Sequence, residues 1–442
     1  MIKFIDLFAG IGGIRLGFEQ ACRELSLSSN CIFSSEIDAK ACETYQLNFN
    51  EYPSGDITKY SDKIPNFDFL LAGFPCQPFS YAGKKQGFGD TRGTLFFEIE
   101  KIIKQHQPPG FLLENVRGLT THDQGRTLAT ILQRLKDLGY STHYIICNSS
   151  NFGIPQNRVR IYILGLLGDK ITITQQSDVG AADSHTYKNL PRQFSLFDKP
   201  GQELTTVKDI LEKNPDPKYN CSPELVARLK KALKGNLELL HGIRFIDYRG
   251  GHSLHSWDLG IKGECTDDEK QFMNALIANR RKKIFGKQQD GKNLTIEQIQ
   301  TFFNHPDTHN IINSLIKKGY LKEINSKYKP VCGNMSFEVF KFLDPESISI
   351  TLTTADAHKL GVFYHGRVRK ITPRECARLQ GFPDTFLLHP EDNFAYRQLG
   401  NTVTVPVVKE LIVDLLKNNS HLFSQYQDNT AEARKNLTPT AL

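Results

Sequence analysis

The chain has 442 residues, of which 39% are hydrophobic and 23% are charged, and its formal net charge is +7. This composition excludes a disordered chain, and the length predicts two or three domains with a large core. No apolar run reaches the roughly 18 residues that span a bilayer, and glycines interrupt the apolar start MIKFIDLFAGIGG before a signal-peptide core forms. We therefore expect a cytoplasmic protein without membrane contact.

Cysteine spacing and charge distribution narrow the class further. The nine cysteines include no CxxC pair, which is typical of reduced thiols rather than of a disulfide framework or a zinc site, and we expect no metal. The net charge is +1 for residues 1–177, +7 for 178–370 and −1 for 371–442. A basic middle region indicates contact with a polyanion, although a solvated surface would give the same count.

Residues 1–177 alternate short apolar runs with helical patterns. The expected strands are Ile2–Phe8, Cys31–Ser35, Phe67–Ala72, Phe111–Glu114, His143–Asn148 and Arg160–Gly165. The expected helices are Arg15–Leu25, Ala39–Asn48, Leu95–Lys104 and Leu128–Leu138. This alternation predicts an α/β domain with a mostly parallel sheet and helices on both faces, whose sites lie at the carboxyl ends of the strands.

From about residue 178 to 370 the sequence becomes polar and less regular, which indicates a separate, smaller domain. Within it, two helical segments, Leu294–Phe303 and His309–Lys318, precede a possible hairpin over Lys322–Lys329. A small core is expected from Ile296, Ile299, Ile311, Ile312, Leu315, Tyr320 and Leu321. This outline over 294–329 is that of a winged helix-turn-helix with His309–Lys318 as recognition helix, and the alternative is an ordinary helical hairpin.

The last part of the chain returns to the style of the first. After Leu399-Gly400-Asn401, the apolar run Val403–Leu416 predicts a helix that docks on the N-terminal sheet. Residues 371–424 are therefore expected to complete the first domain, and 425–442 to form a flexible tail.

Glycine-rich and acidic turns follow the first strands. The turn Asp6–Gly13 contains Gly10, Gly12 and Gly13, which let a ligand approach the backbone at a helix N-terminus. Glu36 after the next strand is placed to accept from ribose hydroxyls, and Asp56 is placed to accept from an adenine amino group. Three such turns at one sheet edge predict a cofactor site, although a single carboxylate at a strand end is more often a helix cap.

The segment GFPCQPFS (73–80) places Cys76 between two prolines just beyond a buried strand. The prolines fix the backbone, so the thiol is presented rigidly at the sheet edge, as a nucleophile requires. The following loop, 81–93, contains four glycines and three cations, and we expect it to close over an anionic substrate.

A polar cluster is predicted near this cysteine. Glu114 ends one strand, and alternation places Gln156, Arg158 and Arg160 on one face of an extended segment. A carboxylate and two guanidiniums are thus expected beside the thiol, although each arginine alone would more often form a surface salt bridge.

These motifs together resemble a known family. The segments DLFAGIGGIRLGFE (6–19), GDI (55–57), GFPCQPFS (73–80), ENV (114–116), QNRVRIYILG (156–165), RECARLQGFP (374–383) and QLGNTV (398–403) occur in the order found in cytosine-5 DNA methyltransferases of bacterial restriction–modification systems. The resemblance covers about 1–177 and 366–420, and 178–365 corresponds to the variable target-recognition region. It implies a Rossmann-like S-adenosylmethionine-dependent methyltransferase domain with an added target-recognition domain.

The resemblance also implies roles for individual residues. Cys76 would add to C6 of cytosine, whose C5 then takes the methyl group of S-adenosylmethionine, leaving S-adenosylhomocysteine. Glu114 would hydrogen-bond N3 and the exocyclic amine, which requires it to be protonated in the transition state. Arg160 would face the target base, and Arg158 would support the pocket.

The remaining residues implied by the resemblance form two groups. The cofactor shell would contain Phe8, Gly10, Gly12, Glu36, Ile37, Asp56, Ile57, Pro75, Leu95, Asn401 and Val403. The DNA contacts would come from Gln77, Ser80, Lys84, Lys85, Arg92 and Gln156. Position 37 is Ile where many family members carry a larger aromatic residue against the adenine.

The implied activity is sequence-specific methylation of a flipped-out cytosine in duplex DNA, which protects host DNA from a partner endonuclease at the same site. A monomer that acts on each strand in turn is expected. Two alternatives stay open: an RNA methyltransferase like the tRNA-directed relatives, and a DNA-binding regulator that uses the winged helix. The basic middle region favours duplex DNA over RNA, and the intact Cys76, Glu114 and Arg160 argue against lost catalysis.

Overall fold

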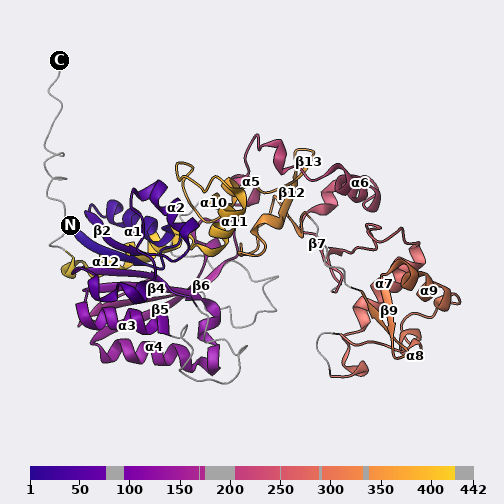
Figure 1. Cartoon of the computed structure of the whole chain (residues 1–442), viewed down its shortest axis with the longest axis horizontal. Helices are drawn as coiled ribbons and strands as arrows, with labels where there is room; N and C mark the ends of the chain where they lie inside the picture. Colours follow the sequence, from indigo (N-terminus) through magenta and orange to yellow (C-terminus); the bar gives the residue numbers. More distant parts are fainter. Residues whose placement is uncertain are drawn as a thin grey trace, which may run out of the picture. The chain divides into compact units, whose positions relative to one another are not determined.

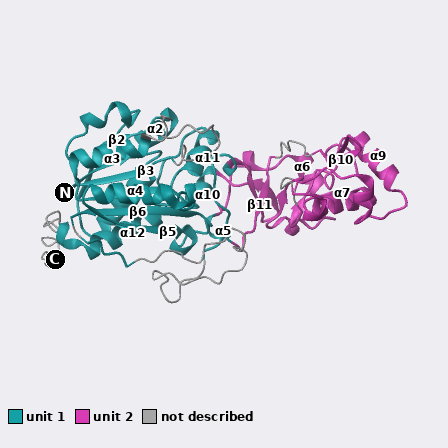
Figure 2. Ribbon diagram, turned by 90° about the horizontal axis from the view of Figure 1, so that it is seen from below, with its two compact units in different colours: residues 1–210, 348–357, 373–442 teal, residues 211–347, 358–372 magenta. Residues whose placement is uncertain are grey.

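The structure, a computed structural model, describes residues 1–75, 94–168, 170–174, 205–248, 250–287, 291–331 and 338–423. It divides into two compact units, shown in Figure 2. Unit 1 consists of residues 1–210, 348–357 and 373–442, and unit 2 consists of 211–347 and 358–372. Residues 348–357, which we expected in the middle domain, therefore belong to unit 1.

Unit 1 is built on a six-stranded sheet with the order β2-β1-β3-β4-β6-β5. Its strands are β1 Ile2–Leu7, β2 Ser29–Ser35, β3 Phe69–Gly73, β4 Gly110–Val116, β5 Tyr140–Asn148 and β6 Val159–Leu167. All neighbouring pairs are parallel except those of β6, which is antiparallel to both β4 and β5. The predicted mostly parallel α/β sheet is confirmed, and each predicted strand overlaps an observed one.

Helices cover both faces of this sheet (Figure 1). The helices of unit 1 are α1 Gly13–Glu24, α2 Ala39–Phe49, α3 Thr94–His106, α4 Arg126–Asp137, α5 Val207–Ile210, α10 Pro373–Arg378, α11 Asp392–Asn401 and α12 Val405–Asn418. Apolar residues of α1 and α12 form one core with one face of the strands, and those of α3 and α4 form a second core with the other face. The C-terminal helix thus completes the N-terminal domain, as its apolar run predicts.

Close packing of α1 on α12 depends on a small residue. A Cβ atom at Gly17 would lie 2.8 Å from the Cβ of Val408 and 2.9 Å from the carbonyl oxygen of Val405. The two helices therefore approach more closely than any side chain at position 17 allows.

The expected C-terminal helix is present but starts two residues later than expected. The helix expected over Val403–Leu416 begins at Val405, and the preceding residues 399–401 end the separate helix α11. Pro406 lies at the first turn of α12, where its missing N–H costs nothing. The extended residues between the helices, 402–404, are buried or half-buried.

Unit 2 contains a five-stranded sheet with the order β13-β12-β11-β7-β8. Its strands are β7 Arg244–Phe245, β8 Ser253–Leu254, β11 Lys341–Leu343, β12 Leu360–Tyr364 and β13 Arg367–Lys370. Helix α6, Pro223–Ala232, contributes Leu225 and Leu229 to the core of this sheet. Neither α6 nor this sheet is among the predicted elements.

The rest of unit 2 forms what we call the helical module, residues 257–331. It consists of α7 Asp267–Asn279, α8 Ile296–Gln300, α9 Thr308–Lys318, β9 Leu321–Ile324 and β10 Lys327–Pro330. The small core expected from the sequence exists, with Trp257, Phe272 and Leu276 added and Ile296 only half-buried. None of the helices in the described ranges is long and apolar enough to cross a membrane.

Candidate active site

The strands of unit 1 bring the predicted site residues to one edge of the sheet. Leu7 at the end of β1 pairs with Ser35 of β2 and with Ala72 of β3. Gly73 at the end of β3 pairs with Glu114 of β4. The segments that follow these strands therefore begin side by side, as expected for parallel strands.

The turn after β1 is held by Glu36. The Gly10 N–H donates to Glu36 Oε2 at 2.8 Å, and the Asp38 N–H donates to Oε1 at 2.8 Å. Phe8 and Gly10 both have φ +55°, and nothing lies within 4 Å of the position that a Cβ of Gly10 would occupy. Gly12 also has a positive φ, and a Cβ there would lie 2.2 Å from the ring of Phe49. The glycines therefore leave an open backbone cradle beside a carboxylate.

Asp56 lies next to Glu36, because the Glu36 N–H donates to the Ser54 carbonyl at 2.9 Å. Asp56 Oδ1 caps a short helical turn by accepting from the N–H and hydroxyl of Thr58. Oδ2 has no partner in the described part of the chain, so a second carboxylate oxygen is available at this edge.

The other expected cofactor residues differ in exposure. Ile37 is 78% exposed, and Pro75 is also exposed, so both offer apolar surface at the edge. Ile57 is buried in the core below, where it supports the turn. Leu95 is half-buried and packs against the same core as Phe8.

We call residues 373–423 of unit 1 the return segment. This segment reaches the same turn from the C-terminal side. A Cβ at Gly13 would lie 2.5 Å from Thr402 Oγ1 and 3.2 Å from Val403 Cγ2, so 402–403 pack directly on the start of α1. Val403 is buried, whereas Asn401 is exposed at the end of α11. The sequence motifs at the two ends of the chain thus meet at one place.

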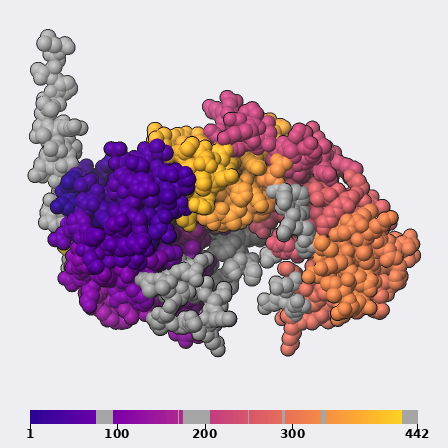
Figure 3. Space-filling view, in the orientation of Figure 1, coloured from indigo at the N-terminus to yellow at the C-terminus, as the bar shows by residue number. Residues whose placement is uncertain are grey.

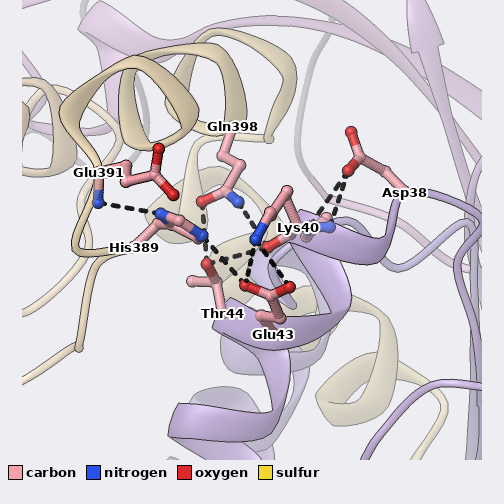
Figure 4. A network of polar contacts seen from close by, with 8 residues as sticks. Asp38, Lys40, Glu43, Thr44, His389, Glu391 and Gln398 are labelled. Carbon is pink, nitrogen blue, oxygen red and sulfur yellow. Dashed lines mark hydrogen bonds and ion pairs between the residues drawn. The ribbon is translucent and has the colours of Figure 1, made fainter.

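A network of polar contacts between α2 and the return segment fixes this arrangement (Figure 4). Gln398 donates to the Lys40 carbonyl at 2.7 Å and accepts from the Thr44 hydroxyl at 3.0 Å. His389 Nε2 lies 3.2 Å from Glu43 Oε2. These contacts place the end of α11 beside the second strand–helix turn.

Glu114 and Arg160 form an ion pair on neighbouring strands. Arg160 Nε lies 3.2 Å from Glu114 Oε1, and the two side chains are 16% and 12% exposed. Burial raises the pKa of Glu114, and the charges of Arg160 and Arg158 act in the opposite direction. The site therefore holds a carboxyl group that takes up a proton more readily than an exposed one.

The chain leading to the predicted nucleophile starts beside Glu114. A Cβ at Gly73 would lie 3.6 Å from Glu114 Oε2, and Asn115 Nδ2 donates to the Phe74 carbonyl at 3.0 Å. Asn115 was not singled out from the sequence, although it directly follows Glu114 at a strand end. The backbone two residues before Cys76 is thus fixed next to the carboxyl group.

Several predicted residues lie outside the described residues. These are Cys76 and the expected DNA contacts Gln77, Ser80, Lys84, Lys85 and Arg92, together with the loop 81–93 that we expected to close over the substrate.

Arg158 and Gln156 are placed inside the protein rather than beside Glu114. The guanidinium of Arg158 is 2% exposed and donates to the carbonyls of Leu352 and Thr402, at 2.8 and 2.5 Å. Burial lowers the pKa of Arg158 to about 9. Gln156 is fully buried and accepts from the Leu352 N–H at 2.8 Å. Both side chains fasten the return segments to β6, and the burial of Gln156 does not favour its expected contact with DNA.

A buried cluster below the first turn was missed at the sequence level. Asp6 is fully buried in β1, and its Oδ2 accepts from the Tyr45 hydroxyl at 3.4 Å. Burial raises the pKa of Asp6 to about 8, and the Arg15 charge opposes this rise. Arg15 itself donates to Tyr45 Oη at 2.9 Å and to Glu51 Oε2 at 2.8 Å. The signal was a carboxylate between the apolar residues Ile5 and Leu7 of a buried strand.

The family model that describes C-5 cytosine-specific DNA methylases matches residues 2–417. The chain belongs to this family. It is 65% identical over 425 residues to the Type II methyltransferase M.BanI of Aneurinibacillus aneurinilyticus, which covers 96% of this chain and 98% of that protein. It is 64% identical over 418 residues to the Type II methyltransferase M.HgiCI of Herpetosiphon aurantiacus, which covers 95% and 98%.

Among solved structures, the chain is similar to the Dnmt2 methyltransferase of S. pombe, with a TM-score of 0.51 and 19% identity over 95% of this chain and 99% of that one. At this identity the likeness concerns the fold, and it confirms the methyltransferase fold expected from the motifs. The DNA methylase family thus accounts for the conserved order of the site segments along this chain.

Proposed function

We propose that this DNA cytosine-5 methyltransferase methylates cytosine within one short duplex sequence, as the protective enzyme of a Type II restriction–modification system. The observation that carries the proposal is the buried Glu114–Arg160 pair beside the backbone that leads to Cys76, in a chain of this family. The Type II methyltransferases named above support the biological role.

The acceptor is a cytosine rotated out of the helix, because C5 and C6 are inaccessible in stacked DNA. The thiolate of Cys76 attacks C6 and forms an S–C6 bond, and the electrons of the C5–C6 double bond move toward C5 and the N3 side of the ring. Protonated Glu114 donates to N3 and so stabilises this charge, while Arg160 holds Glu114 in place. After C5 gains the methyl group, its proton is lost to solvent and the thiolate leaves C6, which restores the aromatic ring.

S-Adenosylmethionine would bind at the edge formed by the first three strands, where it supplies an electrophilic methyl group. The residues fit this molecule: Glu36 can accept from the ribose hydroxyls, Asp56 Oδ2 from the adenine amine, and exposed Ile37 can contact the flat base. The open cradle at Gly10 admits the amino-acid portion. Asn401 and Val403 would close the site from the C-terminal side.

Arg158 and Gln156 act in this proposal as positioning residues. They fix Leu352 and Thr402 against β6, and thereby hold the return segment at the cofactor edge. We further propose that the protein acts as a monomer on each strand in turn and shares its site, but no lasting contact, with the partner endonuclease.

The proposal is tested by transfer of labelled methyl groups to mixed-sequence duplex DNA. We expect Cys76→Ala to abolish transfer, because no other group supplies the C6 nucleophile. Cys31→Ala is the matched control, since Cys31 is the one partly exposed thiol among the described cysteines, and it should retain transfer. Full activity of Cys76→Ala, or transfer to RNA in preference to DNA, would contradict the proposal.

A further inference from the structure

The helical module has a third, one-residue strand that the helices alone do not reveal. Leu294, between α7 and α8, forms an antiparallel bridge with Tyr328 of β10, and the two N–H groups donate to each other's carbonyls at 3.2 and 2.8 Å. The order is helix, strand, helix, helix, strand, strand, which is that of a winged helix-turn-helix with β9 and β10 as the wing. The catalytic proposal gives this module no role.

A cavity of about 890 Å³ lies beside the wing. The salmon and orange atoms of the space-filling view include the helical module (Figure 3). Seven cationic residues line it, namely Arg280, Arg281, Lys287, Lys292, Lys322, Lys327 and Lys329. No Asp or Glu occurs among its described lining residues. A cavity of this size and charge favours an extended anion with repeated charges over a single small one.

Three lysines of the wing lie close together on one face and repel one another. Lys322 of β9 and Lys329 of β10 are direct register partners, and Lys327 lies two residues from Lys329 on the same face. Like charges in opposed positions destabilise a hairpin by themselves. An anion that bridges these lysines would offset their repulsion, which accounts for their presence on the wing.

The opposite wall is built from buried basic groups. Lys292 is 6% exposed, and its Nζ donates to the carbonyls of Arg281 and Lys282, which fixes the turn after α7. A Cβ at Gly291 would lie 2.7 Å from Arg280 Nε, so the guanidinium packs directly on the glycine backbone. Arg281 Nε is buried without a hydrogen-bond partner within the described ranges. This wall is therefore tied together by its own contacts and holds one buried donor without a described partner.

We propose that this cavity binds the sugar–phosphate backbone of duplex DNA outside the methylated sequence, and so anchors the enzyme on its substrate. The inference rests on the proposed DNA-methylating function. The cavity gathers seven cations and, among its described lining residues, no carboxylate, which suits the repeated phosphates of a DNA strand. Helix α9, predicted as the recognition helix, contributes no residue to the cavity. The wing and the segment that follows α7, rather than α9, therefore supply the phosphate contacts of the module.

The test compares the full-length protein with the variant Lys322→Gln/Lys327→Gln/Lys329→Gln. Binding to a fluorescent mixed-sequence duplex is measured by anisotropy over a range of salt concentrations, and methylation is measured alongside. We expect the slope of log K against log salt to fall by about two to three, since each lost phosphate contact removes about 0.9. The KM for DNA should rise at least tenfold, while kcat at saturating DNA changes less than twofold.

The matched control is Lys213→Gln/Lys230→Gln/Lys234→Gln, which removes the same charge from exposed positions of unit 2 outside the cavity. This control variant should keep more than half of the wild-type slope of log K against log salt. Its KM for DNA should be nearly unchanged. Melting temperatures of both variants verify folding, and the single variant Lys322→Gln, expected to lower the slope by about one, replaces the triple variant if the latter unfolds.

Two outcomes would overturn the inference, and a third bears on the proposed function alone. A wing variant that equals the control in KM and salt slope while methylating DNA normally would refute the anchor and leave the proposed function intact. Displacement of the wild-type protein from DNA by inorganic phosphate at millimolar concentration, or by duplex RNA at lower concentration than DNA, would assign the cavity another occupant. Absence of methylation in every variant refutes the proposed function instead, and the anisotropy slopes still decide the anchor.

Discussion

Glu114 is the residue whose protonation the proposed chemistry requires. Its carboxyl group is held against Arg160 in a mostly buried position, and burial raises its pKa. The protonated form is lost as pH rises through this raised pKa, so kcat should fall on the alkaline side. Because this account assigns the pH dependence of kcat to one carboxyl group, a single substitution tests it.

Glu114→Gln should lower kcat about 10²- to 10³-fold, because the amide can still hydrogen-bond N3 and the exocyclic amine but is too weak an acid to transfer a proton toward N3. The remaining activity should lose the alkaline decline, since the amide does not titrate. A pH profile of kcat checks both points, with the exposed Glu24→Gln as a control of wild-type behaviour. An alkaline decline that persists unchanged in Glu114→Gln would exclude this carboxyl group as its source.

Asp6 makes the stability of the protein depend on pH. Its pKa is raised to about 8 in the folded state by burial, against an ordinary value of 3.8. The folded state thus holds a proton that the unfolded state releases, and the free energy of unfolding falls as pH rises from about 4 to about 8. The slope contributed by this group is at most about 1.4 kcal/mol per pH unit.

Asp6→Asn should remove this slope. The free energy of unfolding of the variant, relative to that of the wild type, should therefore be higher at pH 8 than at pH 5. Denaturant unfolding at several pH values measures the effect. Asp137→Asn, at an exposed position of α4, is the control and should reproduce the wild-type profile. Equal slopes in Asp6→Asn and wild type would show that Asp6 is ionised in the folded protein.

At the scale of elements, the contact of α1 with α12 holds the return segment on the N-terminal sheet. Gly17→Ala should destabilise the protein by about 1–3 kcal/mol, because the added methyl group meets the backbone of Val405 as well as a side chain. Gly118→Ala adds the same atom where only Val116 Cγ2 lies within 4 Å, at 3.8 Å, and should be nearly neutral. The melting temperatures of the two variants measure this difference. Equal melting temperatures would mean that α1 and α12 move apart without a loss of stability.

Elements with a strong local signal could be predicted, and those that depend on distant partners could not. The buried strands of unit 1 are apolar runs, so their positions follow from the sequence alone. Alternation predicts Gln156, Arg158 and Arg160 on one face, but it cannot show that residues 348–357 and 402 cover the first two. Helices α6 and α7 were not predicted, because their few apolar positions lie among charged and polar residues.

At the scale of the whole molecule, the two ends of the chain build one catalytic unit around a separately folded second unit. The sequence motifs predicted this arrangement, because the C-terminal motifs are needed beside the N-terminal ones to complete a single site. The middle segment of unit 1, residues 348–357, carries no periodic pattern, and its place emerges only from its contacts with residues 155–158 just before β6.

The central claim is that this enzyme methylates C5 of cytosine in a specific duplex sequence. It is tested most directly by incubating the purified full-length protein with S-adenosylmethionine and a mixed-sequence DNA duplex, followed by conversion sequencing. We predict that protected cytosines occur in one short motif and at one position within it. No protected cytosine at any position, under conditions in which the protein binds the duplex, would contradict the account.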